Sequence, residues 1–521
     1  MNNFSSLLKE FFIGFVIFLI PVVSFFKPFN LRQLSTFDFY LILESLIVIL
    51  FALIIFSFVL HFTITKIFKA QLRSIFPLLC FGFYLLFFFA PFHELVANTI
   101  FQQGFASYFT VICLFFIWLA ILIAVMYSKK FALVFIRSVV IFASINILLF
   151  LVLNTRTGYL NNIRGEKFDS DILNTNGVFS PEEFDLIKTK NITKNKNIYY
   201  IIMDEMLGLK LAEKVNIINY LEVKASLQQT NLTYIDKTYS SYNSTHLTLA
   251  TIMGIDLPIT EHSVKYKNES NFFPLMMYQD KKSVPLPSLI KMLGSEFIWV
   301  GNKSMSCLEW ENQPWTCIYS NKVRNLKHLV RTFYSTTPLE RIVFNLLSEG
   351  NERNLKYYLE YSRKNKKIDN SKFVFIHQMS PHEPHNVNET CQPKNYTDVY
   401  EGYKSSYRCV LQEVKDLMSY IAVEDPEAIV VIQGDHGWFT IPQKLTTPKN
   451  KLLFHASIFN AIKAPEVCFE KFGEPQSTVN TIRFILNCAY GFDLSYLPLV
   501  HYEAFLKEND PRYGSVIAHK F

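Results

Sequence analysis

The side chains best suited to chemistry in this sequence are an aspartate and a histidine that follow an apolar run. Ile429–Gln433 begins with four β-branched residues, a pattern typical of a buried strand in a parallel sheet, and Asp435 and His436 follow after Gly434. In open α/β sheets, ligands bind beyond the carboxyl ends of the strands. A carboxylate and an imidazole here are therefore candidate metal ligands, although a buried Asp–His pair can also simply close a turn.

A second apolar run ends in the same way. Ile198–Met203 reads as a buried strand and is followed by Asp204 and Glu205. Two strands of one sheet would bring Asp204, Asp435 and His436 to one point, with Glu205 as a further candidate ligand. A mixed set of nitrogen and oxygen ligands suits zinc or manganese, whereas calcium or magnesium would suit an all-oxygen set. The histidine favours zinc over manganese or calcium.

A candidate nucleophile lies between these two strands. The segment Tyr239–Ile255 has a hydroxyl-rich turn followed by residues that can form a buried helix. Ser244 or Thr245 would then stand at a helix N-terminus, where free N–H groups and the helix dipole favour a phosphate or sulfate. A metal ion at this place would activate the hydroxyl. The alternative is an ordinary Ser/Thr helix cap.

The third group consists of histidines. Phe373–His385 runs from a strand pattern into a proline-containing loop with three imidazoles, those of His377, His382 and His385. Such a cluster can bind a second metal or a phosphoryl oxygen, or protonate a leaving group; the alternative is a histidine-rich surface loop. His455 is a weaker candidate, since a single histidine beside an apolar run is more often structural.

The elements that would position these residues alternate along the second half of the chain. Apolar runs predict strands at Ile198–Met203, Phe297–Val300, Phe373–His377, Ile429–Gln433 and Ser457–Ile462, and helical spacing occurs at Ser288–Leu293, Leu339–Leu347 and Tyr407–Ile421. Strands alternating with helices predict an α/β domain with a mostly parallel central sheet and helices on both faces.

The first half of the chain has a different composition. Most of the 50 phenylalanines precede residue 154, and five apolar segments are long enough to span a bilayer, for which about 20 residues suffice. They lie near Phe11–Pro28, Phe39–Phe62, Ile75–Phe92, Phe105–Met126 and Phe131–Leu153. We therefore predict a transmembrane domain of five helices over residues 1–153, a polar linker over 154–196 with one short helix from Ser180, and a catalytic domain over 197–521.

Basic residues set the predicted orientation. Lysines and arginines concentrate in alternate loops (Lys9; Lys66, Lys69 and Arg73; Lys129 and Lys130), and the opposite loops hold only Lys27 and Arg32. By the positive-inside rule the N-terminus is cytoplasmic, and five spans then put the second half outside the cytoplasm. The net charge of +7 includes no dense basic block, so nucleic-acid binding has no support and a surface next to an anionic membrane is the simpler interpretation.

The cysteines agree with an oxidising compartment. Cys80 and Cys113 lie in apolar runs, and the other six fall as sequence neighbours: Cys307 with Cys317, Cys391 with Cys409, and Cys468 with Cys488. None has the C-x-x-C spacing of a zinc or redox motif. We predict three local disulfides, with connectivity left open by the sequence.

Taken together, these motifs resemble the alkaline-phosphatase/sulfatase superfamily, and most closely its membrane phosphoethanolamine transferases, such as lipid A phosphoethanolamine transferases, and the related lipoteichoic acid synthases. The resemblance implies Asp204 as a metal ligand with Glu205 as a possible second one, and Asp435 and His436 as the Asp–His metal pair. It implies Thr245 in NSTHLTLATIM as the nucleophile, with Ser244 beside it as a substrate contact. His377 and His382 match the segment in which a histidine contacts metal or substrate, with His385 as a further substrate contact. His382 is also the candidate catalytic histidine, and His455 matches a later histidine of the metal site that could assist it.

The sequence departs from that pattern in two places. The phosphoethanolamine enzymes usually carry Gly–Glu at the first strand end, where this chain has Asp204–Glu205, and a proline where Ala250 stands. These departures leave the donor headgroup open. No C/S-x-P/A-x-R motif of true sulfatases occurs near Thr245, which disfavours sulfate-ester hydrolysis.

The resemblance implies a multi-pass enzyme of the bacterial inner membrane with a periplasmic catalytic domain. It would move phosphoethanolamine from phosphatidylethanolamine, through a phospho-threonine, to an envelope glycan such as lipopolysaccharide or lipid A. The alternatives are a phosphoglycerol transferase or a hydrolase of the same fold, and a non-catalytic membrane receptor or scaffold.

Overall fold

The computed structural model describes part of the chain. The described residues are 11–19, 47–48, 50–60, 62–63, 66, 75–88, 112–121, 123–124, 134–135, 137–138, 141, 145, 196–260, 284–301, 315–318, 353–364, 371–394, 396, 398–441, 447–505 and 515–521. The chain divides into two compact units, Met1–Glu166 with Arg324–Glu349, and Lys167–Val323 with Gly350–Phe521. Each unit is described by itself.

The first unit holds the apolar segments of the sequence. Its longest described helix is α4, Ile75–Phe88, in which Leu78 is buried against Ile121 and Phe135 and accepts a hydrogen bond of 3.0 Å from the Trp118 indole. Among the residues described, no helix combines the length and the apolar character needed to cross a membrane. Each of the five predicted spans falls partly on residues outside the described ones, and the helices predicted from Ser180 and over Leu339–Leu347 lie wholly outside them.

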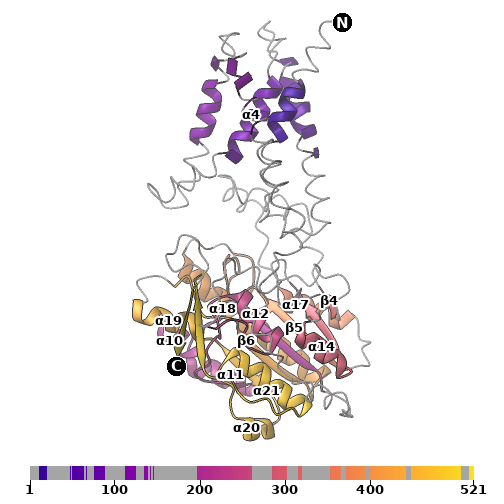
Figure 1. Ribbon diagram of the computed structural model, residues 1–521, viewed down its shortest axis with the longest axis vertical. Helices are drawn as coiled ribbons and strands as arrows, with labels where there is room; N and C mark the ends of the chain where they lie inside the picture. The colour runs from indigo at the N-terminus through magenta and orange to yellow at the C-terminus, as the bar shows by residue number, and fades with distance from the viewer. Residues whose placement is uncertain are drawn as a thin grey trace. The chain divides into compact units, whose positions relative to one another are not determined.

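The second unit is built on a mixed sheet (Figure 1). Its described strands are β1 Ile198–Met203, β2 Thr233–Tyr234, β3 Glu296–Val300, β4 Trp315–Ile318, β5 Lys372–Gln378, β6 Ile429–Gly434 and β7 Asn460–Lys463, in the order β2-β7-β6-β1-β5-β3-β4. The five strands from β6 to β4 are parallel, while β7 and β2 are antiparallel to their neighbours. The predicted mostly parallel sheet is confirmed, with two antiparallel strands at one edge.

Helices cover both faces of this sheet. They are α10 Leu209–Lys214, α11 Tyr220–Gln229, α12 Thr245–Gly254, α14 Pro285–Met292, α17 Asn354–Lys364, α18 Val399–Glu424, α19 Pro448–Ala456, α20 Glu466–Phe472 and α21 Thr478–Tyr490. Because side chains alternate along a strand, β1 buries Ile198, Tyr200 and Ile202 under α12, α14 and α21, and the residues between them under α10, α17 and α18. All six residues of β1 are buried for this reason.

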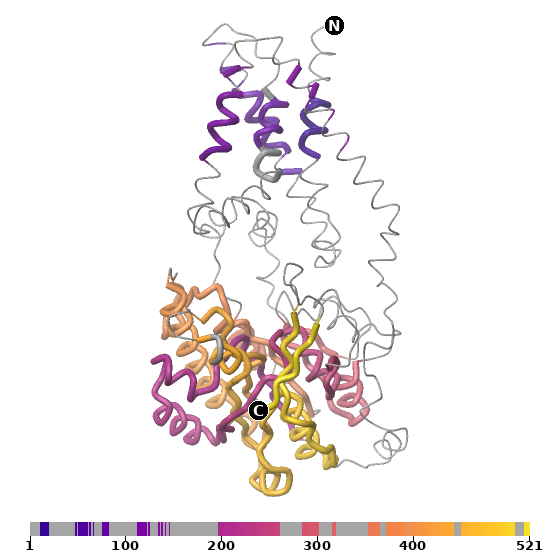
Figure 2. The backbone as a smooth tube through the Cα atoms, turned by 60° about the vertical axis from the view of Figure 1, so that its left-hand side comes forward, coloured from indigo at the N-terminus to yellow at the C-terminus, as the bar shows by residue number. Residues whose placement is uncertain are grey.

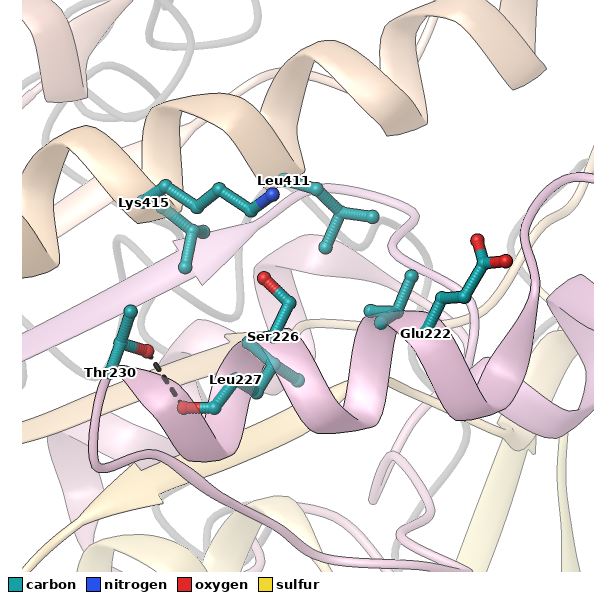
Figure 3. A pocket seen from close by; sticks show the side chains of 8 residues that line it. Glu222, Ser226, Leu227, Thr230, Leu411 and Lys415 are labelled. Atoms are coloured by element: carbon teal, nitrogen blue, oxygen red, sulfur yellow. Dashed lines mark hydrogen bonds between the residues drawn. The ribbon is translucent and has the colours of Figure 1, made fainter.

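A two-stranded sheet completes the unit. Strands β8 Val500–Ala504 and β9 Val516–Lys520 pair antiparallel. They lie side by side in Figure 2, and β9 leads to the C-terminus. On the face of the main sheet that α10, α17 and α18 cover, α11 and α18 border a cavity of about 180 Å³ (Figure 3). Its lining includes Leu227, Leu411 and Val414, with Glu222 and Lys415 beside them, and none of the candidate site residues.

The predicted elements differ from the observed ones mainly at their ends. The strand predicted at Ser457–Ile462 lies at Asn460–Lys463, because helix α19 continues to Ala456. The helix predicted over Tyr407–Ile421 extends as α18 to 26 residues, beginning at an Asp398 cap whose carboxylate accepts from two backbone N–H groups. The short strands β2, β4, β8 and β9 were not predicted, since pairing partners distant in sequence define them.

Two of the predicted disulfides are present. Cys391 is bonded to Cys409 and Cys468 to Cys488. Cys317 is also disulfide-bonded, and Cys307, the partner predicted for it, lies outside the described residues, so that pairing stays a prediction. Cys80 and Cys113 are free thiols, as expected.

Candidate active site

Three parallel strands end together at one edge of the sheet. Met203 of β1 is in register with Gln378 of β5 and Gly434 of β6, so the residues after each strand meet beyond this edge. The backbone N–H of Asp204 donates to the carbonyl of Gln378 over 2.9 Å, which continues the pairing by one residue. The two carboxylates predicted to converge, those of Asp204 and Asp435, are therefore neighbours.

The side chains gathered here form a compact acidic and imidazole cluster. Asp204, His377 and Asp435 are all buried, and one ligand atom of each lies within 4.8 Å of the others. His377 Nε2 is 3.6 Å from Asp204 Oδ2. His436 Nε2 lies 3.4 Å from Asp435 Oδ2 and 3.8 Å from Asp204 Oδ1. The sequence left His377 open as a metal or substrate contact, and its position lies among the candidate metal ligands.

The hydrogen bonds of His436 fix which of its nitrogens faces the cluster. Nδ1 lies 2.9 Å from the carbonyl oxygen of Gly437, and because a carbonyl only accepts, Nδ1 carries the proton in the neutral ring. Nε2 then presents a lone pair to the cluster. The hydroxyl of Thr245 is 3.2 Å from this atom and can donate to it.

Charge in this cluster is only partly compensated by the protein. Burial raises the pKa of the Asp204 carboxyl well above its usual value, and the carboxylates of Asp435 and Glu205 raise it further. Burial lowers the pKa of His377 to about 4, so its imidazole is neutral near pH 7 and offers a lone pair. Within the described part of the chain, Asp204 Oδ1 and Asp435 Oδ2 are buried without a hydrogen-bond partner.

Such uncompensated oxygens are costly unless a cation is bound. Two buried carboxylates and neutral imidazoles in reach of one point are the donor set that divalent metals take in proteins. The residues therefore fit a divalent metal ion.

Glu205 lies beside the cluster in an unusual backbone conformation. Its φ of 61° is in the left-handed region, and its backbone N–H donates to Asp435 Oδ1 over 2.9 Å. Oε1 accepts from the N–H of Phe439, and Oε2 is buried with no hydrogen-bond partner in the described residues. Burial raises the pKa of the Glu205 carboxyl, although the imidazoles of His382 and His436 lower it in part.

Thr245 is the first residue of α12, with Ser244 as its cap in extended conformation. The helix is apolar, and all eight residues from Leu247 to Gly254 are buried, which fixes its N-terminus at the strand edge. Two hydroxyl groups connect this helix and the turn before it to the residue that follows β6: Thr248 Oγ1 donates to the Asp435 carbonyl over 3.1 Å, and Ser240 Oγ lies 2.5 Å from the same oxygen.

The remaining predicted histidines occupy three different environments. His382 donates its backbone N–H to the Asp204 carbonyl over 3.2 Å, and its Nδ1 pairs with the Glu383 carbonyl, so its Nε2 carries the lone pair. His385 is buried against α18, edge-on to the Tyr403 ring at 5.9 Å. His455 stacks on Phe439 at 4.0 Å, and burial lowers its pKa to about 3.

Several residues around the site were missed from the sequence. The hydroxyls of Ser240 and Thr248 contact the backbone carbonyl of Asp435, and residue spacing does not reveal a contact of this kind. His246 follows the candidate nucleophile and is near enough to His377 to affect its pKa. Its position directly after Thr245 was a signal that could have included it. Asn243, two residues before Thr245, bonds to the distant strand β8.

Comparison with known families decides the assignment. The family model named Sulfatase matches residues 196–457, about half of the chain, which includes every candidate site residue described above. The chain belongs to the sulfatase family. The prediction that it is an enzyme of the alkaline-phosphatase/sulfatase superfamily is thereby confirmed. A search of curated proteins finds no match.

Solved structures that resemble this sulfatase-family chain are distant. The C-terminal periplasmic domain of EcEptC from Escherichia coli is 14% identical, with 63% of this chain and 93% of that chain covered and a TM-score of 0.40. The lipoteichoic acid synthase LtaP from Listeria monocytogenes is 12% identical, with 65% and 90% covered and a TM-score of 0.36. The integral membrane phosphoethanolamine transferase EptA from Neisseria meningitidis is 11% identical, with 92% and 95% covered and a TM-score of 0.36.

Proposed function

We propose that this protein is a metal-dependent phosphoethanolamine transferase that uses Thr245 as its nucleophile. The observation that carries the proposal is the 3.2 Å contact between the Thr245 hydroxyl and His436 Nε2, beside the buried Asp204–Asp435 cluster. A hydroxyl at the N-terminus of a helix and next to a cation site is suited to attack on a phosphodiester. A lipoteichoic acid synthase and a phosphoethanolamine transferase are among the solved structures that the chain resembles.

The proposed metal is zinc, held by Asp204, Asp435 and His436. His377 is well placed to join them, and Glu205 and His455 are candidates for a further ion. Zinc would neutralise the buried carboxylates and lower the pKa of the threonine hydroxyl. The neutral imidazole of His377 supports nitrogen ligation, which favours zinc over calcium or manganese.

The reaction would proceed in two displacements. In the first, the Thr245 oxygen forms a bond to the phosphorus of phosphatidylethanolamine, and the bond from phosphorus to the glycerol oxygen breaks. The proton lost by Thr245 ends on that oxygen, and diacylglycerol leaves. In the second, a hydroxyl or phosphate of an envelope glycan such as lipid A attacks the phospho-threonine, and Thr245 regains a proton as it departs.

His382 is the proposed acid and base for these proton transfers. Its backbone is anchored to Asp204, and its Nδ1 is engaged by the Glu383 carbonyl, so Nε2 is the nitrogen that can exchange a proton. Ser244, His377 and His385 were predicted as substrate contacts. Of these, Ser244 adjoins the nucleophile as the cap of α12, whereas His385 packs against Tyr403.

We further propose that residues 1–153 form five membrane spans that hold the lipid donor, and that residues 197–521 form a periplasmic catalytic domain of an inner-membrane protein. The two disulfides of the catalytic unit support an oxidising compartment. The concentration of basic residues in alternate loops of the first half supports the orientation.

A comparison of bacterial cells with and without the gene would test the transfer. We expect mass spectrometry of lipid A and other envelope glycans to show a gain of phosphoethanolamine that is lost in the Thr245→Ala variant. Peptide mass spectrometry of the purified full-length protein, quenched after incubation with phosphatidylethanolamine, should show phosphoethanolamine on Thr245.

Each other result has a defined meaning. A gain of phosphoglycerol would identify the alternative transferase, and release of free phosphoethanolamine without any glycan product would identify a hydrolase. Full transfer by Thr245→Ala would refute the threonine mechanism. Full activity after stringent chelation would refute the metal role.

A further inference from the structure

Strand β8 has one edge that β9 does not occupy. In the β8–β9 pair, Phe505 donates its N–H to Ser515 on the β9 side. Because backbone groups alternate in direction along a strand, Tyr502 and Ala504 point theirs to the opposite edge. There they meet the loop that leads into α12, whose residue Tyr242 forms a parallel bridge with Tyr502.

At least four hydrogen bonds join this loop to β8. The Tyr502 N–H donates to the Ser241 carbonyl over 2.9 Å, and His501 Nδ1 donates to the Ser240 carbonyl over 2.8 Å. The side chain of Asn243 makes the other two: its Oδ1 accepts from the Ala504 N–H at 2.9 Å, and its Nδ2 donates to the Ala504 carbonyl at 3.0 Å. An exposed edge of a sheet is thus covered by the loop before the nucleophile.

Asn243 is bonded to β8 only two residues before the nucleophile. Only Ser244, in extended conformation, separates it from Thr245. The bidentate pairing fixes the position and the direction of the Asn243 side chain, since both its donor and its acceptor are used. A shift at this residue would move the start of α12, and with it the Thr245 hydroxyl relative to His436.

We propose that Asn243 is a positioning residue for Thr245. By pairing with Ala504 on the edge of β8 that β9 does not occupy, it holds the Thr245 hydroxyl against His436. The proposal rests on the nucleophilic role of Thr245 proposed above. The anchor, residues 500–504, lies outside the 196–457 match to the sulfatase family model.

The chain offers a matched control for this role. Asn487 on α21 makes the same bidentate pairing with a backbone peptide: its Nδ2 donates to the Leu494 carbonyl over 2.9 Å, and its Oδ1 accepts from the Leu494 N–H over 2.8 Å. Replacing either asparagine by alanine removes two hydrogen bonds of equal geometry. The two variants should therefore lose similar stability, while only one of them acts on the nucleophile.

The test compares Asn243→Ala and Asn487→Ala in the full-length protein, by release of diacylglycerol from phosphatidylethanolamine and by thermal unfolding. For Asn243→Ala we expect a fall in kcat of about 10- to 100-fold with KM changed less than about twofold, because misplacement of a reacting group by about 1 Å has an effect of that size. Asn487→Ala should keep both constants within about twofold of wild type at a comparable loss of unfolding temperature.

A second variant separates geometry from fold. Asn243→Gln keeps the amide but carries it one methylene further, so it should fold and still lose most of the rate. Crystal structures supply a readout independent of any assay: the 3.2 Å contact of Thr245 Oγ1 with His436 Nε2 should lengthen in Asn243→Ala and persist in Asn487→Ala.

The proposal is overturned if Asn243→Ala keeps wild-type kcat, if Asn487→Ala loses as much, or if the Thr245–His436 contact persists in Asn243→Ala. If wild-type protein releases no diacylglycerol, that result refutes the proposed function and not the positioning role of Asn243. The two crystal structures then still decide the positioning role.

Discussion

Replacing Asp204 by asparagine would remove one negative charge from the buried cluster while keeping the shape of the side chain. In the metal-free protein, Asp204 and Asp435 lie with ligand atoms within 4.8 Å. Two unit charges at that separation repel by about 3 kcal/mol at an effective dielectric constant of about 20. Partial protonation of Asp204 reduces this cost, so we expect Asp204→Asn to stabilise the metal-free protein by about 1 to 3 kcal/mol.

The sign of the pH dependence follows from the raised pKa of Asp204. A carboxyl whose pKa is higher in the folded state retains a proton that the unfolded chain has lost, so folding stability falls as pH rises between the two values. The advantage of Asp204→Asn should therefore be present at neutral pH. It should disappear as the pH falls below the ordinary value of 3.8, where both states are protonated.

Metal binding should reverse the order of stability. A ligand that binds only the folded state stabilises it by about 2.7 kcal/mol at a concentration 100 times its Kd. We expect excess zinc to raise the unfolding temperature of wild type and to have little effect on Asp204→Asn, which should also lose transfer activity. Asp236→Asn is the control: Asp236 pairs with Lys210 and Lys224 at the surface, so its replacement should leave the response to zinc unchanged.

Thermal unfolding of the chelator-treated full-length protein, with and without added zinc, measures both effects. A metal-free Asp204→Asn protein that is less stable than wild type would refute the electrostatic reasoning. An unchanged response of that variant to zinc would refute the assignment of Asp204 as a ligand.

Three further outcomes are expected. His382→Ala should lower the transfer rate by about 10²- to 10⁴-fold, whereas His385→Ala should mainly lower the unfolding temperature; equal rates for the two would contradict the separation of their roles. Burial lowers the pKa of His501 to about 4, so this residue alone should reduce the folding stability by about 3 kcal/mol as pH drops from 6.5 to 4. His501→Gln should show less of that fall in denaturant titrations, and an identical fall would count against the buried neutral imidazole. Replacing Cys468 and Cys488 together by serine opens a loop of sequence separation 20 and should cost about 3 kcal/mol in denaturant unfolding, and no loss would argue against the disulfide.

Local pattern predicted the elements that carry the site. β1 and β6 are buried along their whole length because both faces of a parallel sheet are covered, and their apolar runs let the strand ends, and the acidic residues that follow, be read directly. Helix α12 was predicted for a similar reason, since its hydroxyl-rich start and apolar body mark an N-terminus in any context. The side chains of Asp204, Asp435 and Thr245 therefore entered the candidate site before any fold was known.

Assignments that depend on packing were decided only by the tertiary structure. His377 is the last but one residue of β5, and only the pairing of β5 with β1 brings its imidazole to Asp204. His385, from the same predicted group, turns instead to Tyr403. Sequence spacing cannot distinguish these two imidazoles, because the direction of each depends on residues far away in the chain.

The sequence by itself thus determined the residue types of the candidate site, the strand ends on which the carboxylates lie, and the helix that begins with Thr245. The tertiary structure decided which histidines join the carboxylates and which element holds the loop before Thr245. Asn243 illustrates the difference: its partner Ala504 is 261 positions away, and the hydrogen bonds between them connect a side chain to a backbone peptide. Backbone groups are the same in every residue, so no sequence pattern marks such a contact.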